Sequence, residues 1–174
     1  MSPKIGTNSW LERLGKNAAF QKVISLPLRD RRERYDGELL LRFLSLRRAT
    51  PDMLAAARDA TEFLNTQARN LAKDITLEQN VEDTIFKRTF FLLESALSGK
   101  ALHSEVQGAD ETSLEFDLAL YDATTIGLAS NLDRFDDAPV ERVEAGIEHC
   151  RAATLRGQSV QHSVETGRRL FANV

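Results

Sequence analysis

Three closely spaced arginines, Arg31, Arg32 and Arg34, are the side chains of this sequence best suited to bind phosphate. A planar guanidinium pairs with two phosphate oxygens at once. A segment that neutralises several phosphates binds nucleic acid in a salt-dependent way. Asp30 and Glu33 interleave with the arginines of the cluster Arg29–Arg34, so a solvated or internally paired charge run is the favoured alternative. Contact with nucleic acid or phosphate is the functional hypothesis.

A second set of charged residues, Glu38, Arg42 and Asp122, falls within apolar segments. Glu38 precedes Arg42 by four residues, which is the favourable order for an ion pair along one helix. Asp122 has apolar or small neighbours on its helical face, and a buried carboxylate needs a partner. We hypothesise that Arg42, or another arginine between positions 29 and 48, supplies that partner. Both arrangements predict a structural rather than a catalytic role.

The residue types that enzymes use most often are scarce, because the chain has three histidines and one cysteine. No HExxH, CxxC, GxGxxG or phosphate-loop pattern occurs in the sequence. We therefore predict no catalytic residue, no metal site and no cofactor in this chain. Cys150 lies on a helical pattern and is interpreted as a small core residue rather than a reactive thiol.

Two arginine and histidine spacings resemble the Arg-x(4–6)-His pattern of the HEPN family of helical ribonucleases. They join Arg142 to His149 and Arg156 to His162. The resemblance implies RNA cleavage at a cleft between two copies of the chain. The residues that follow the arginines are valine and glycine, where that family prefers polar residues. A solvated or helix-end histidine is the alternative.

Helical periodicity runs through almost every segment that positions these residues. Between Leu39 and Leu46 the apolar side chains cover an arc of roughly 220° on a helical wheel. This helix is therefore expected to be buried on most sides. Thr50 and Pro51 give a start signal, and the alanine-rich run that follows has no breaker before Asp74. We expect one long helix there.

The next segment, from about 77 to 97, has one broad apolar face that includes Val81 and leaves Phe91 on the charged side. Residues 108–113 are rich in turn formers, and a further helical pattern starts at Leu114.

Proline and serine start signals at Pro139 and Ser159 predict two more helices near the end of the sequence. The sequence has no convincing strand and no internal repeat. We predict an all-α fold of six to eight helices in an orthogonal or mixed bundle, with residues 1–174 as one helical domain.

Composition is that of an ordinary globular domain. The chain has 174 residues, 42% of them hydrophobic and 28% charged, with a net charge of −3. Residues 1–48 carry a net +6 and the remainder −9, so the two parts either face each other or one of them meets a charged partner. No signal-peptide pattern and no membrane-spanning stretch occurs. We expect a soluble, cytoplasmic protein without a membrane partner.

Three segments resemble one known family in the same order along the chain. Asp36 to Leu46 is similar to the pattern "D-x-E-L-V-L-R-F-L-A-L". Residues 63–65 match "F-L-N", and residues 120–123 are similar to "L-F-D-A". These patterns follow the ParB/sulfiredoxin-like domain in the family called domain of unknown function 262, which includes the GmrS part of GmrSD-type modification-dependent restriction systems. The resemblance covers residues 1–132 loosely.

The resemblance implies that this chain is the helical C-terminal half of a longer or split protein. In that family the nucleotide-handling motif DGQQR lies in the N-terminal domain, and neither it nor an HNH nuclease motif occurs here. The implied partner is a ParB/sulfiredoxin-like domain, in cis or in trans, which would hold the nucleotide. The implied whole is a nucleotide-dependent DNA endonuclease of restriction or antiphage defence, with Arg31, Arg32 and Arg34 facing DNA or nucleotide phosphate.

Three functional hypotheses follow from the sequence. The first is a non-catalytic helical module of such a DNA-processing protein. The second is a free-standing helical adaptor that binds another protein through Phe91 and other misplaced apolar residues. The third is a HEPN-like ribonuclease.

Overall fold

The computed structural model describes residues 7–26, 35–57, 59–73, 78–97, 102–107, 112–153 and 155–174. These ranges contain nine α-helices, one short 3₁₀ helix and two strands, which confirms the predicted all-α class. The elements are α1 (Thr7–Gly15), α2 (Ala18–Ile24), α4 (Tyr35–Arg48), α5 (Pro51–Ala55), α6 (Ala60–Lys73), α7 (Gln79–Ala96), β1 (His103–Gln107), β2 (Thr112–Phe116), α8 (Leu118–Ala129), η1 (Leu132–Phe135), α9 (Val140–Ala152) and α10 (Val160–Ala172).

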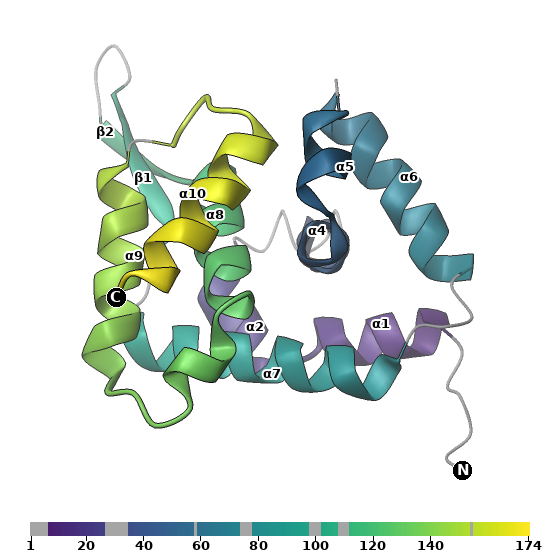
Figure 1. Cartoon of the computed structure of the whole chain (residues 1–174), viewed down its shortest axis with the longest axis horizontal. Helices are drawn as coiled ribbons and strands as arrows, with labels where there is room; N and C mark the ends of the chain where they lie inside the picture. Colours follow the sequence, from purple (N-terminus) through teal and green to yellow (C-terminus); the bar gives the residue numbers. More distant parts are fainter. Residues whose placement is uncertain are drawn as a thin grey trace.

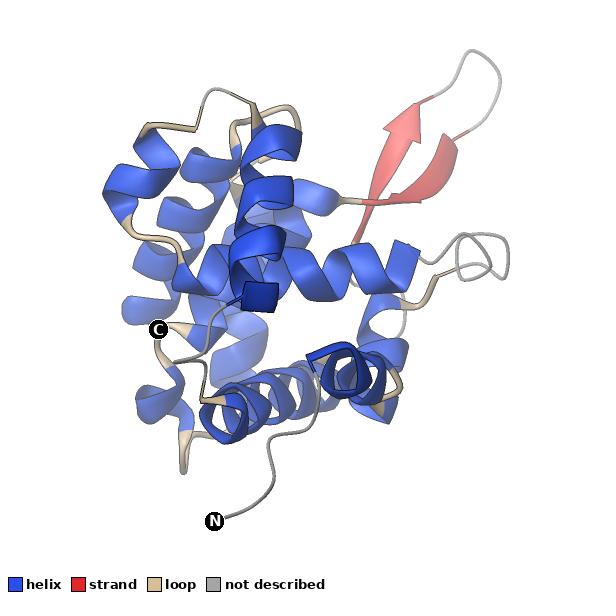
Figure 2. Ribbon diagram, turned by 90° about the vertical axis from the view of Figure 1, so that its right-hand side faces the viewer, coloured by secondary structure: helices blue, strands red, loops and turns tan. Residues whose placement is uncertain are grey.

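The helices run in several directions rather than along one bundle axis. In Figure 1, α4 is seen almost end-on, α7 runs across the view, and α6 and α9 run steeply at opposite sides. The two strands form a small hairpin that projects from the helical body (Figure 2). No helix in the described ranges is long and apolar enough to cross a lipid bilayer.

A cluster of four phenylalanine rings joins α2, α4 and α7. Phe20, Phe43, Phe86 and Phe90 are fully buried, and their neighbouring ring centroids lie between 4.6 and 5.6 Å apart. Such tilted and edge-to-face pairs add to the stabilisation that burial of their area provides. The expected burial of α4 is confirmed, because nearly all of its apolar side chains lie in the core.

The prediction of one long helix from Thr50 to Asp74 is wrong. The structure divides it into α5 and α6, and the helix ends after Ala55. The Thr50 hydroxyl caps α5 as predicted, and Asp59 starts a new helix because its Oδ1 accepts a hydrogen bond from the Glu62 amide at 2.7 Å.

The expectation of no strand, with a helix from Leu114, is also wrong. Residues 112–116 pair antiparallel with 103–107, so that His103 lies opposite Phe116. The helix begins four residues later than predicted, because the Asp117 side chain accepts from the Leu120 amide and caps α8. The Asp117 amide also donates to the Leu102 carbonyl, which closes the hairpin against the helix.

Helices α8 and α10 approach so closely that they touch backbone to backbone. A Cβ added to Gly127 would lie 2.6 Å from the Gly167 carbonyl oxygen. A Cβ on Gly167 would clash with the carbonyl oxygen of Ala123. Backbone atoms in two helices cannot move aside separately, so both positions require glycine for the helices to pack at this distance.

We expect Gly167→Ala to lower the free energy of unfolding by about 1–3 kcal/mol, because the added methyl group overpacks the contact. Urea unfolding followed by circular dichroism measures the change. The matched control is Gly37→Ala, where a Cβ meets nothing within 4 Å. Gly37 lies inside a helix, so alanine should be neutral or stabilise by up to about 1 kcal/mol. Equal effects at the two glycines would contradict the close contact.

Candidate functional site

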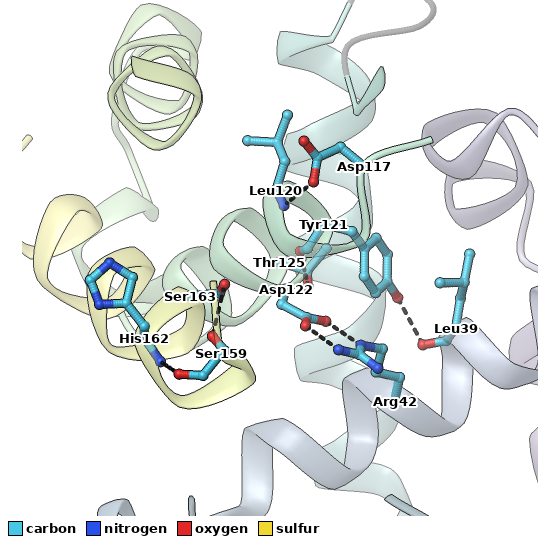
Figure 3. Close-up of polar contacts among 10 residues, drawn as sticks. All are labelled: Leu39, Arg42, Asp117, Leu120, Tyr121, Asp122, Thr125, Ser159, His162 and Ser163. Carbon is cyan, nitrogen blue, oxygen red and sulfur yellow. Dashed lines mark hydrogen bonds and ion pairs between the residues drawn. The ribbon is translucent and has the colours of Figure 1, made fainter. Parts of the chain in front are cut away.

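A buried ion pair connects α4 to α8. Arg42 donates from Nε to Asp122 Oδ1 at 2.6 Å and from Nη2 to Oδ2 at 2.5 Å (Figure 3). The Arg42 side chain is 13% exposed and the Asp122 side chain 1%. This two-point geometry matches both carboxylate oxygens. The structure thus pairs Asp122 with Arg42, one of the arginines between positions 29 and 48 that the sequence suggested as its partner.

The residue before Asp122 fixes the same two helices against each other. Tyr121 is fully buried, and its hydroxyl donates to the Leu39 carbonyl at 2.9 Å (Figure 3). Leu39 and Arg42 are three residues apart on α4, so they lie on one face of that helix. Two consecutive residues of α8 therefore bind one face of α4, which sets the position of the Arg42 guanidinium.

Burial dominates the electrostatics of this contact. It raises the pKa of the Asp122 carboxyl more than the Arg42 guanidinium lowers it. Burial alone would lower the pKa of Arg42, but its hydrogen bonds and charge interaction with Asp122 raise that pKa overall. Burial, followed by the nearby Asp122 charge, raises the pKa of Tyr121 well above its usual range. Arg42 and Asp122 therefore each stabilise the charged form of the other.

A pocket of about 330 Å³ lies over the Arg42 side chain and is called the Arg42 pocket below. Its walls come from α4, from α6 and from the start of α8. The residues that bear on function are Glu38, Leu39, Leu41 and Arg42 of α4 with Leu64 and Asn65 of α6. The pocket combines leucine side chains with a carboxylate, a guanidinium and a carboxamide, which suits a mixed apolar and polar ligand surface.

The three segments that carry the family resemblance meet at this place. Residues 36–46 and 63–65 contribute to the Arg42 pocket, and residues 120–123 supply the Asp122 that holds Arg42. They are far apart in the sequence and adjacent in the fold. The resembling residues thus build one site rather than three unrelated core positions.

Glu38 does not take part in the buried pair. The Nε and Nη2 groups of Arg42 bind Asp122, so the alternative ion pair along α4 does not form. Glu38 is exposed at the edge of the Arg42 pocket. No basic side chain within the described ranges pairs with it.

The phosphate-binding hypothesis is not tested by the structure. Arg31, Arg32 and Arg34 lie outside the described residues. Their contact with nucleic acid or phosphate therefore stays a prediction. Among the residues that are described, no group of three or more histidine, cysteine, aspartate or glutamate side chains could hold a metal ion.

The two arginine and histidine spacings do not form pairs in the contacts that the structure gives. Arg142 stacks over the Phe135 ring, 5.4 Å from its centroid, and donates to the Val174 carbonyl. Arg156 binds Glu115 at 2.8 Å. His149 and His162 are exposed on α9 and α10. Both arginines are engaged with groups other than the histidines.

Sequence reasoning missed a second buried ion pair, between Arg47 of α4 and Glu82 of α7. Glu82 is 3% exposed and also accepts a bond from Arg48 at 3.2 Å, whereas the neighbouring Val81 is 47% exposed. The expectation that Val81 lies on the apolar face is therefore wrong. The available signal was the spacing of Glu82 from Phe86, four residues along the same buried stripe.

Comparison of the chain with models of protein families, with curated proteins and with solved structures gives no match. The resemblance of the three segments therefore remains a hypothesis about the family.

We expect Arg42→Ala to lower the free energy of unfolding by about 3–5 kcal/mol, because it leaves the Asp122 carboxylate buried without a partner. The matched control is Glu38→Ala, which removes the carboxylate four residues earlier. It should change stability by less than about 0.5 kcal/mol, as an exposed residue does. Urea unfolding of the two variants measures both values. A larger loss in Glu38→Ala would show that Glu38 is the true partner of Arg42.

The Cys150 thiol should not react in the folded protein. It is fully buried, and burial raises its pKa to about 12. At pH 8 only about one Cys150 side chain in ten thousand is then in the reactive thiolate form. We expect a disulfide reagent to label Cys150 only as fast as the protein unfolds, and faster when urea is added. Rapid labelling of the native chain would contradict the structural interpretation of this cysteine.

Proposed function

We propose that this chain is a non-catalytic helical module that supports a ParB-like, nucleotide-dependent DNA-processing protein of restriction or antiphage defence. In this proposal residues 1–174 act as the C-terminal half of a longer or split protein. The nucleotide is bound by the ParB/sulfiredoxin-like partner domain, in cis or in trans, and DNA is the substrate of the assembly. Such a role would place the protein in the cytoplasm.

One observation carries the proposal. Two of the three resembling segments line the Arg42 pocket, and the third supplies Asp122, which binds Arg42. The arrangement supports a shared fold for this part of the family, while the activity follows from the resemblance alone.

The contacts around the pair support a structural and docking role for this chain. Asp122 and Tyr121 are buried and bound to α4, so they serve to hold the helices together. The groups around the Arg42 pocket that remain exposed, such as Glu38 and Asn65, are suited to bind a partner surface.

An adaptor that binds an unrelated protein is the second candidate, and the exposure of Phe91 favours it. Phe91 lies on α7 and is 64% exposed, the largest value among the big apolar side chains of the described residues. Leu114 of β2 and Val81 of α7 are also exposed. An aromatic side chain in this position can anchor a partner.

Co-expression tests the leading proposal. The gene is expressed with the ParB/sulfiredoxin-like, DGQQR-containing protein or domain encoded beside it, using an affinity tag on one chain. We expect the two to purify together, and nucleotide-dependent DNA cleavage to require both. The HEPN alternative is tested in the same preparations with RNA and with the His149→Ala and His162→Ala variants.

Two results would contradict the proposal. One is a locus that encodes no DGQQR-containing partner, and the other is a partner that fails to associate with this chain. A Phe91→Asp variant distinguishes the adaptor. It should leave association with the ParB-like protein unchanged, whereas loss of association would place the interface on α7.

A further inference from the structure

Two pockets open next to each other on the N-terminal half of α4. The first is the Arg42 pocket. The second, called the α1 pocket, is about 840 Å³ and lies between α4 and α1, with Leu11 and Gly15 on one side and Asp36, Gly37 and Leu40 on the other. The two pockets share Glu38 and Leu41, which form the boundary between them. The two hollows lie side by side along α4, one toward α6 and one toward α1, and are together called the α4 groove below.

The inner surface of the α4 groove is apolar. Leu40 is buried, and Leu11, Leu41 and Leu64 are partly buried, so their remaining exposed surface faces the two hollows. These leucines come from three different helices. Apolar surface of this kind gains free energy when a partner covers it.

The edge of the groove is acidic. Among the described residues, Glu12, Asp36 and Glu38 line it with one lysine, Lys16, so the described side chains give it a net negative charge. Arg42 adds little positive charge, because Asp122 neutralises it. No basic side chain of the described residues forms an ion pair with any of the three acids. Asp36 accepts hydrogen bonds from the Gln21 side chain and the Gly37 amide, so Glu12 and Glu38 are the acids that the described side chains leave to a partner.

We propose that the α4 groove binds a short amphipathic helix with basic edges that belongs to the partner domain. One apolar side chain of this helix enters the Arg42 pocket and a second enters the α1 pocket, on either side of Leu41. A lysine or arginine beside them pairs with Glu38 at the boundary. Helices that dock in grooves place their anchors at i, i+3, i+4 and i+7, which suits two neighbouring hollows.

The charges select this partner over other amphipathic segments. An acidic helix would face Glu12, Asp36 and Glu38 and would be repelled, whereas a basic one is attracted and orientated. The identity of the partner domain rests on the proposed function, but the chemistry of the bound segment rests on the groove alone.

Two model peptides test the inference with the full chain. Both carry leucine at positions i, i+3, i+4 and i+7, and they differ only in lysine or glutamate at the flanking positions. Binding is followed by fluorescence anisotropy and by backbone NMR shifts of the labelled protein. We expect the basic peptide to bind, with the largest shifts around Leu11 and Leu41, and the acidic peptide to bind at least about tenfold more weakly.

Charge reversal at the boundary gives the decisive comparison. Glu38→Lys should weaken binding of the basic peptide about tenfold or more, because a positive charge then replaces the attractive negative charge at the centre of the groove. Glu144→Lys is the matched control on the exposed face of α9 and should leave binding unchanged. Glu38 is exposed, so its variant should fold, and circular dichroism checks this. Equal binding of both peptides, no effect of Glu38→Lys, or shifts centred on Phe91 would each overturn the inference.

The same variants separate this inference from the proposed function. Suppose that the ParB-like protein purifies with the unaltered chain and equally with its Glu38→Lys and Leu41→Asp variants. The groove is then not the docking site, although the proposed function stands. If no ParB-like protein associates but the basic peptide binds in the groove, the proposed function fails and the chain is an adaptor for basic helices.

Discussion

The Arg42 and Asp122 pair is the contact on which the geometry of the rest depends. Two charged groups leave water and meet in a place where their hydrogen bonds satisfy each other. A pair of this kind contributes modest net stability, because desolvation opposes the attraction between the charges. The pair has a stronger effect on which packing forms, since any other packing of α4 on α8 would leave a buried charge without a partner. Tyr121 reinforces the same register through the Leu39 carbonyl.

The consequences extend to the surface. Because Asp122 binds Arg42, Glu38 lies at the boundary of the two pockets without a basic partner among the described residues. The buried pair thus produces both a fixed inner face of α4 and an acidic, grooved outer face. Under the proposed function, this hollow face of α4 is the surface that receives the partner domain. The close contact of Gly127 and Gly167 in α8 and α10 provides the rigid base for this arrangement.

Most features set by local sequence were predictable, and most features set by contacts between distant segments were not. The burial of α4 follows from its wide apolar arc, and the need of Asp122 for a partner follows from its apolar neighbours. The hairpin was missed because Leu114 and Leu118 continue a helical spacing, while the pairing of residues 112–116 with 103–107 is decided between segments. Glu82 was missed because its burial depends on Arg47, 35 positions earlier in the chain. The break before α6 did have a local signal, the capping residue Asp59, which the alanine-rich run concealed.

A double-mutant cycle on Arg42 and Asp122 tests the central claim most directly. The free energy of unfolding is measured by urea for Arg42→Ala, Asp122→Ala and the double variant. If the two residues form one buried unit, the double variant loses no more stability than either single variant, with a coupling energy of at least about 2 kcal/mol. Additive losses would show that the two side chains act independently, and the account of how α4, its pocket and its groove are positioned would then be wrong.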